Sequence, residues 1–372
     1  MTRIPSWVLV GALALALVAC STPAAAPAKP TGSAPAAPAT SGAAPSASAS
    51  APAANGSGSG APAGSAPAAA PARRTIQYGL VNFSAFYWPI YVGLDKGFFD
   101  REALDVETTE TRSGTDGMSA MAGGSLDVIT TNSEVVVLAQ THGADAIGIA
   151  GFNNKASYSL MVQPEIQRIT DLKGKTLGAS ALRTGEVVFM KALLRKYGLT
   201  ENDYSLVVAG ASRNRVTAMS TKQIDGTVMP PPDNYRLEDM GIKRLAEVNE
   251  AVPEYQFQFL AAMRNWAQGH QDETVRFLRA YVNSLHWLYD PANKPQAVAV
   301  LQERMQLTDD YARRAYEQWI EQEQFFPHDG EAPDGGLKAM EDMLVDTGEA
   351  TPPLPARDKY LDFKYLELAK AQ

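Results

Sequence analysis

Cysteine is almost absent from this sequence of 372 residues, because Cys20 is the only one. A single thiol excludes zinc sites built from several cysteines, dithiol redox motifs and disulfide frameworks within the chain. Histidine is scarce as well, and His142, His270, His286 and His328 include no pair at the helical spacing of metal ligands. We therefore expect no metal site and no cofactor.

Charged side chains are almost absent from the first 72 residues, which contain only Arg3 and Lys29. The rest of the chain holds 31 basic and 41 acidic side chains, a net charge of about −10. Such an acidic body argues against nucleic acid as a partner, because phosphate recognition needs a basic face. About 300 residues are enough to bury a core without a disulfide or metal.

The N-terminus carries an export signal. An apolar run from Trp7 to Ala19 follows Arg3, and it is too short for an ordinary membrane-spanning helix. The run ends in Leu17-Val18-Ala19-Cys20 and resembles the lipobox of bacterial lipoproteins. The resemblance implies that residues 1–19 are removed and that Cys20 carries the lipid. The alternative is an unmodified signal sequence that is cut after a small residue.

Residues 20–72 are predicted to be a disordered tether. After Cys20 this segment consists of Ala, Pro, Gly, Ser and Thr, with Lys29 and Asn55 as the exceptions. Such a composition cannot bury a core. A flexible-coil estimate gives the tether a span of roughly 36 to 43 Å. This length would hold the body clear of a membrane.

The body alternates short β-prone runs with helical patterns, which is typical of α/β units. Two such series predict two lobes, and the chain after Tyr255 turns largely helical. The predicted strands are at 74–83, 104–108, 126–130, 146–150, 175–179, 204–209, 226–229 and 243–248. The predicted helices begin after Pro89 and continue at 113–122, 134–142, 186–197, 216–222, 272–289, 295–305 and 308–323.

Five segments in this order resemble one family, the substrate-binding proteins of ABC importers for nitrate, sulfonates, taurine and thiamine precursors. These segments are Trp88-Pro89-Ile90-Tyr91-Val92-Gly93-Leu94-Asp95-Lys96-Gly97-Phe98-Phe99, Leu104-Asp105-Val106-Glu107, Met121-Ala122-Gly123-Gly124-Ser125-Leu126-Asp127-Val128, Asp171-Leu172-Lys173-Gly174-Lys175-Thr176-Leu177-Gly178 and Gln223-Ile224-Asp225-Gly226. The quoted segments run from 88 to 226, and the resemblance extends over about 75 to 290. Each motif is weak alone, and their order and spacing carry the resemblance.

The resemblance implies a two-lobed periplasmic-binding-protein fold of type II, in which each lobe is a mainly parallel sheet flanked by helices. We expect lobe 1 at 73–160 and 253–372, where the C-terminal helices belong, and lobe 2 at 161–252. Hinge crossings are expected near 157–163 and 252–260. The family implies a small-molecule ligand between the lobes, an ABC permease as partner and a location outside the cytoplasm. We expect a monomer that is held to the lipid bilayer through Cys20.

Candidate ligand-binding residues follow the carboxyl ends of predicted strands, where open α/β sheets bind ligands. Among these residues, Arg183 could offer a guanidinium to a carboxylate or sulfonate, and Thr184 could bind the ligand or only cap the next helix. Aromatic side chains around Trp88 could stack on a planar solute. The candidate set is Asn82, Phe83, Ser84, Phe86, Trp88, Arg112, Ser113, Asn132, Ser133, Ser180, Arg183, Thr184, Gly185, Arg213 and Asp233.

The charge of the ligand stays open at this point. Arginines near the candidate set favour an organic anion or a planar aromatic acid, whereas Glu134 and Asp233 would suit an amine or a sugar. An enzyme of the same fold acting on a small carboxylate is one alternative function, and a ligand sensor for a membrane signalling protein is another. The sequence contains no nucleophile elbow and no phosphate-binding loop, so we expect a receptor without enzymatic activity.

Overall fold

A computed structural model of the chain describes residues 72–371 except 82 and 183. These residues belong to one compact unit that spans 68–372. The predicted signal peptide, Cys20 and the predicted tether up to residue 71 lie outside the described residues. Asn82 and Arg183 of the candidate set lie outside them as well. No helix in the described part of the chain is both long and apolar enough to cross a membrane.

The first sheet has five strands in the order β2-β1-β3-β10-β4. Strand β1 pairs in parallel with β2 and β3, whereas β10 is antiparallel to both of its neighbours, β3 and β4. Four strands therefore point one way, and β10 runs against them. The bounds are β1 Arg74–Leu80, β2 Leu104–Glu110, β3 Val128–Asn132, β4 Ala146–Asn153 and β10 Gln258–Met263.

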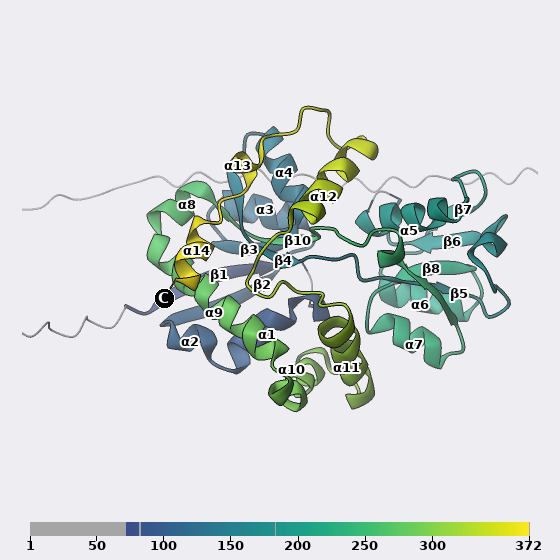
Figure 1. The fold of residues 1–372 in the computed structure, drawn as a ribbon, viewed down its shortest axis with the longest axis horizontal. Coiled ribbons are helices and arrows are strands. Elements are labelled where there is room, and N and C mark those ends of the chain that lie inside the picture. Colours follow the sequence, from purple (N-terminus) through teal and green to yellow (C-terminus); the bar gives the residue numbers. More distant parts are fainter. Residues whose placement is uncertain (1–71, 82, 183, 372) are drawn as a thin grey trace, which may run out of the picture. The chain divides into compact units, whose positions relative to one another are not determined.

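The second sheet repeats this plan with the order β7-β6-β8-β5-β9. Strand β5 is antiparallel to β8 and β9, while β6 pairs in parallel with β7 and β8. Figure 1 shows the two sheets as separate groups, each with its own helices. The bounds are β5 Ser159–Val162, β6 Thr176–Ala179, β7 Ser205–Val208, β8 Gly226–Met229 and β9 Lys243–Glu247. We call the first sheet with its helices the first lobe and the second sheet with its helices the second lobe.

Helices cover both sheets. Those of the second lobe are α5 Gly185–Lys196, α6 Ser212–Ser220 and α7 Asp233–Asp239. Those of the first lobe are α1 Trp88–Asp95, α2 Phe98–Arg101, α3 Gly114–Ala122, α4 Ser133–Thr141, α8 Arg264–Gly269, α9 Gln271–Tyr289, α10 Lys294–Met305, α11 Asp309–Tyr316, α12 Asp334–Asp346, α13 Arg357–Tyr360 and α14 Lys364–Lys370. A π-helical turn, Glu317–Gln322, extends α11.

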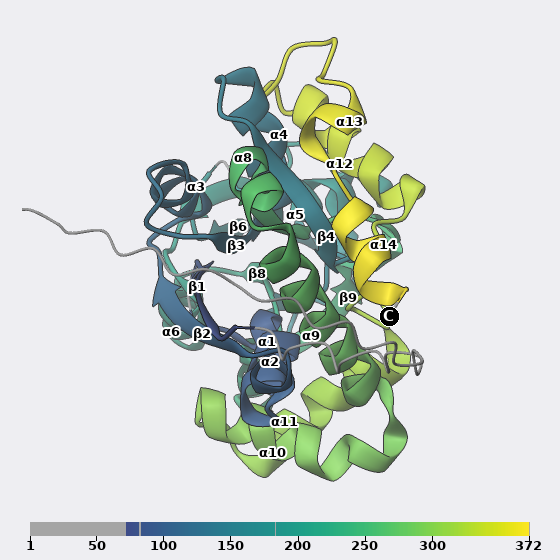
Figure 2. The same cartoon turned by 90° about the vertical axis from the view of Figure 1, so that its left-hand side faces the viewer.

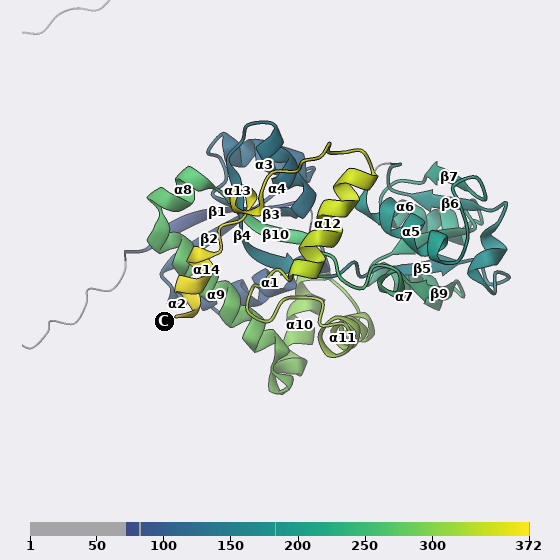
Figure 3. The same ribbon diagram turned by 45° about the horizontal axis from the view of Figure 1, so that its top comes forward.

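The long helix α9 anchors the first lobe. Its apolar stripe, which contains Leu278, Leu285 and Leu288, is fully buried. The helix packs against α1, α2 and α14 (Figure 2). On another side of the same lobe, α12 packs against α4 (Figure 3). Burial of apolar surface drives this packing.

The predicted two-lobed α/β fold is confirmed. Two of its strands, β5 and β10, were not predicted. Strands β5 and β10 occupy parts of the predicted hinge crossings near 157–163 and 252–260. The chain passes from β4 to β5 through 154–158 and reaches β10 through 251–257. Each missed strand has a neighbouring strand on both sides and is buried on both faces. It therefore shows no apolar–polar alternation that a sequence reading could detect.

Candidate ligand-binding cleft

A cavity of about 190 Å³ lies where the carboxyl ends of β1, β3 and β6 face the two crossings. This is the position at which open α/β sheets bind ligands. Its walls come from both lobes and from the crossings between them. The lining residues are Val81, Phe86, Tyr87, Asn132, Tyr158, Ser180, Thr184, Gly185, Glu186, Phe257 and Gln258.

Aromatic rings form one wall of the cavity. The ring centroid of Phe86 lies 5.7 Å from that of Phe257 and 6.3 Å from that of Tyr158. Behind it, Phe86 stacks on Trp319 with the centroids 5.5 Å apart. Phe257 and Tyr158 belong to the two crossings, so rings from the first lobe and the hinge region meet here. Such a wall offers flat apolar surface to a planar solute.

Uncharged polar groups complete the cavity. Gln258 Nε2 lies 3.4 Å from Asn132 Oδ1, and Gln258 Oε1 accepts a hydrogen bond of 2.6 Å from the amide of Asn153. Thr184 occupies the N-cap position of α5, but its side chain makes no capping hydrogen bond, and its hydroxyl donates to Ala181 O at 3.4 Å. Capping by the Thr184 hydroxyl is therefore wrong. Its side chain lines the cavity together with Gly185.

A buried ion pair supports the second-lobe wall. Glu186 Oε2 lies 3.0 Å from Arg215 Nη2, and the two residues are 8% and 2% exposed. The other oxygen of Glu186 accepts a hydrogen bond of 2.7 Å from the backbone N–H of Ser180. Arg215 also donates to Val228 O at 2.9 Å. The carboxylate thus holds the Ser180 loop, and the arginine compensates its charge.

A second cavity of about 380 Å³ shares Asn132, Thr184 and Gly185 with the first. It contains the carboxyl group of Glu134, which accepts a hydrogen bond from the phenol of Tyr255. Burial raises the pKa of Glu134 to about 7, and the Tyr255 hydrogen bond opposes this shift. The full lining is Ser113, Thr115, Asn132, Glu134, Val135, Leu138, Thr184, Gly185, Val188, Met343, Leu344, Thr347 and Glu349.

Six predicted residues line these two cavities, namely Phe86, Ser113, Asn132, Ser180, Thr184 and Gly185. Two more candidates, Ser84 and Ser133, are absent from both linings, and their buried hydroxyl oxygens have no hydrogen-bond partner among the described residues. Ser133 sits beside the cleft at the start of α4, and Ser84 precedes Phe86.

The remaining described candidates lie away from the cleft. Trp88 is wholly buried in the first lobe, and its indole N–H donates to Ala297 O at 3.2 Å, so no ring face is open to a ligand. Phe83 is 50% exposed and stacks on Tyr91 outside the cleft. Three charged candidates are absent from both cavity linings as well: Arg112 pairs with Asp116, Asp233 pairs with Arg236, and Arg213 is exposed at the start of α6.

The candidate set omitted Tyr158, Phe257, Gln258 and Glu186, which also line the first cavity. The first three lie on or beside the crossings, which a search of strand ends in each separate lobe does not cover. Aromatic side chains within a predicted hinge would have been the available signal. Glu186 resembles an ordinary acidic residue in the first turn of a helix. Only the buried Arg215 beside it sets it apart.

Comparisons with known proteins agree with this architecture. The sequence model of the NMT1/THI5-like family matches residues 85–295, more than half of the chain. The protein YtlA of Bacillus subtilis strain 168 is 23% identical over 257 residues, covering 66% of this chain and 76% of YtlA.

Solved structures share the fold. The periplasmic nitrate-binding protein NrtA from Synechocystis PCC 6803 aligns with a TM-score of 0.67 at 14% identity, covering 81% of this chain and 90% of NrtA. The periplasmic sulfonate-binding protein SsuA from Methylobacillus flagellatus KT, described as part of a sulfonate ABC transporter, aligns with a TM-score of 0.65 at 17% identity. That alignment covers 80% of this chain and 94% of SsuA. Both are described as binding proteins, and at these identities the likeness shows a shared fold.

Proposed function

Because the chain belongs to the NMT1/THI5-like family, we propose that it is the solute receptor of an ABC importer. The receptor binds a small organic solute between its lobes and delivers it to the permease. The fold shared with NrtA and SsuA supports a solute-binding role outside the cytoplasm. The cavity lined by both lobes supports the position of the ligand.

The observation that carries the ligand class is the wall of rings formed by Phe86, Tyr158 and Phe257. We propose a planar solute, because flat rings gain most from stacking or edge contacts with such a wall. Asn132, Gln258 and Thr184 would fix its orientation through hydrogen bonds. The two lobes, with boundaries expected near residues 160 and 252, would close on the solute as rigid bodies about the crossings 154–158 and 251–257.

Native mass spectrometry of the purified full chain tests this proposal directly. A mass above that of the polypeptide should match a small planar molecule, and titration calorimetry should give its affinity. Phe257→Ala should weaken binding at least tenfold, whereas Tyr197→Ala, an exposed aromatic residue at the end of α5, should leave it unchanged. A bound molecule without a ring, or equal affinities in wild type and Phe257→Ala, would contradict a planar ligand.

We further propose that the solute is an acid and that Arg183 binds its anionic group. A charge-assisted hydrogen bond is worth about 1.5 to 3 kcal/mol, so Arg183→Ala should weaken binding roughly tenfold to a hundredfold. The matched control is Arg195→Ala, an exposed arginine in the last turn of α5. Equal ligand affinity in Arg183→Ala and wild type, with the fold intact, would contradict an anionic ligand bound by Arg183.

Closure of the two lobes can be measured without knowing which residues bind the ligand. Small-angle scattering should give a smaller radius of gyration with the co-purified solute than after its removal. An identical radius in both states would count against moving lobes.

We also propose that the protein acts as a monomer tethered to the membrane through Cys20.

A further inference from the structure

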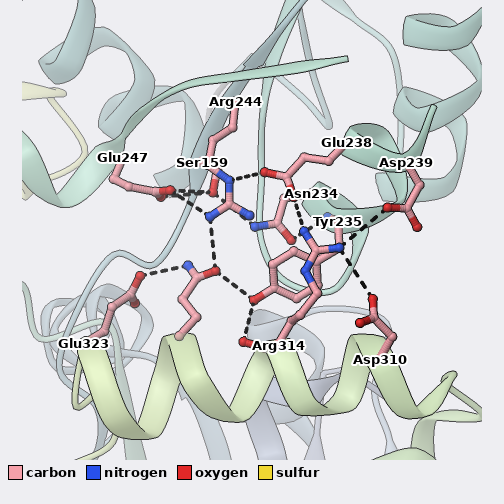
Figure 4. A network of polar contacts seen from close by, with 11 residues as sticks. Ser159, Asn234, Tyr235, Glu238, Asp239, Arg244, Glu247, Asp310, Arg314 and Glu323 are labelled. Carbon is pink, nitrogen blue, oxygen red and sulfur yellow. Dashed lines mark hydrogen bonds and ion pairs between the residues drawn. The ribbon is translucent and has the colours of Figure 1, made fainter. Parts of the chain in front are cut away.

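The two lobes also meet at a polar contact outside both cavities. Helix α7 and strand β9 of the second lobe face α11 and the π-helical turn Glu317–Gln322 of the first lobe (Figure 4). The contact lies at the β5–β9 edge of the second sheet, whereas the cleft lies at β6. Its side chains are absent from the linings of both cavities.

A buried phenol lies at the centre of this contact. The hydroxyl of Tyr235 on α7 is 2.8 Å from Gln318 Oε1 and 3.1 Å from the backbone oxygen of Arg314. Tyr235 is almost fully buried, although its hydroxyl bonds only to atoms of the other lobe. Separation of the lobes would break these hydrogen bonds.

Two arginines alternate with carboxylates around Tyr235. Arg314 of the first lobe pairs with Glu238 of α7, and its guanidinium lies over the Tyr235 ring, 4.2 Å from the centroid. Arg244 of β9 pairs with the same Glu238 at 2.6 Å and lies 3.4 Å from Gln318 Oε1. Glu238 thus joins one arginine from each lobe. Tyr311 of α11 adds a hydrogen bond of 2.6 Å to Asp239.

The second-lobe side of the contact is rooted in its sheet. Arg244 also pairs with Glu247 at 3.0 Å, and Glu247 accepts a hydrogen bond of 2.9 Å from Ser159 of β5. Asn234 donates to the hydroxyl of Ser159 at 3.1 Å. The second-lobe side chains that contact the first lobe are therefore held by their own sheet. They have little freedom to keep the contact if the first lobe moves away.

The first-lobe side touches the ligand cleft. The π-helical turn that carries Gln318 also carries Trp319, which is fully buried and stacks on Phe86 of the cleft wall. The indole N–H of Trp319 donates to Ser157 Oγ in the first crossing at 2.7 Å. π-Helical turns often occur at functional sites. Here one such turn connects the lobe contact, the crossing and the cleft wall.

We propose that the contact of Tyr235 and Glu238 with Arg314 and Gln318 is a latch that holds the two lobes at their present spacing. The latch is separate from the ligand cleft and would bias the equilibrium between lobe arrangements before any solute arrives. Two ties between the lobes at its centre are the hydrogen bond of the Tyr235 phenol and the ion pair of Arg314 with Glu238. Removing both should widen the range of distances between the lobes.

The test is a distance measurement on the full chain without ligand. Cys20→Ser removes the only native thiol, and Ser119→Cys on α3 with Arg195→Cys on α5 places one exposed label on each lobe. Double electron–electron resonance then gives the distribution of label distances. Tyr235→Phe/Arg314→Gln should broaden it and shift its mean by several ångströms. Arg313→Gln is the control, since Arg313 pairs with Asp309 of its own helix.

A distribution in Tyr235→Phe/Arg314→Gln that equals that of the parent would overturn the latch. Circular dichroism and thermal melting establish that each variant is folded. If the double variant does not fold, Tyr235→Phe alone is measured and judged by the same criterion, since it removes only one hydroxyl. The result is independent of the proposed ligand and permease, because the measurement contains neither.

Discussion

The phenol of Tyr255 donates a hydrogen bond to the carboxyl group of Glu134, and its ring packs edge-on against Phe189 with the centroids 4.8 Å apart. Glu134 lies in the first turn of α4 in the first lobe, Phe189 lies on α5 in the second, and Tyr255 belongs to the return crossing. One hinge residue therefore contacts both lobes. Any rotation of the lobes must change the environment of at least one of its two partners.

The stability of the protein should depend on pH through Glu134. Burial raises its pKa from 4.5 to about 7, so the folded state holds this proton more tightly than the unfolded chain. The resulting contribution is fully present below pH 4.5 and is lost as the pH rises through about 7. Urea unfolding between pH 5 and 8 should show a flatter pH profile in Glu134→Gln than in wild type.

Glu165→Gln provides the control for this pH profile, because Glu165 is exposed in a loop of the second lobe. Its profile should match that of wild type. A steep wild-type profile that Glu134→Gln leaves unchanged would assign the pH dependence to another group. Glu247 is the next candidate, since burial also raises its pKa to about 7.

Arg215→Met should destabilise the second lobe strongly. The substitution leaves the carboxylate of Glu186 buried without its partner, which typically costs about 3–5 kcal/mol. Arg215→Met/Glu186→Gln removes both charges and should recover at least about 2 kcal/mol of that loss. Chemical denaturation of the two variants and wild type measures the difference. A double variant that is no more stable than Arg215→Met would mean that the pair is not the source of the effect.

Gly151→Ala should destabilise the first lobe. A Cβ at this position of β4 would lie 2.1 Å from the backbone oxygen of Glu331, and the N–H of Gly151 already bonds to Gly330 O at 2.7 Å. The C-terminal segment would have to move away from the strand, at a cost of about 1–3 kcal/mol. Thermal melting should place Gly151→Ala clearly below Gly269→Ala, whose new Cβ meets nothing within 4 Å. Equal melting temperatures would contradict this close approach.

Cys20→Ala should release the protein from the membrane or leave its signal peptide attached. Stable anchoring needs more than one acyl chain, as the resemblance to lipoproteins implies for Cys20. Membrane fractionation and mass spectrometry of the N-terminus measure both outcomes, with Ser21→Ala as the control. Wild-type protein that is wholly soluble and has an unmodified N-terminus would disprove lipidation.

Local sequence patterns predicted β2 and α9, because burial on one face leaves a periodic signal, and a short apolar run of β-prone residues predicted β1. The position of the cleft followed from the rule for strand ends, and Thr184 and Asn132 were found in this way. Contacts distant in the sequence were not predictable. Arg215 is an example, because nothing near it in the sequence indicates that it is buried against Glu186 of another helix.

The aromatic candidates show the same limit. Phe86 and Trp88 are two residues apart, and the sequence gives both the same prospect of meeting a ligand. The structure turns Phe86 to the cavity and Trp88 to the core beneath α10, where Ala297 accepts its N–H. Which ring faces the cavity is decided by contacts with helices that follow some two hundred residues later in the chain.

The strand order of the first sheet has a consequence for biosynthesis. Within that sheet β4 pairs only with β10, so it has no neighbouring strand until residues 258–263 have been made. The second sheet draws all five strands from one continuous stretch, 159–247. As the chain emerges from the ribosome, the second sheet can therefore be completed first, although its strands begin later in the sequence. The first sheet, which already has β1, β2 and β3, is completed only when β10 has been made.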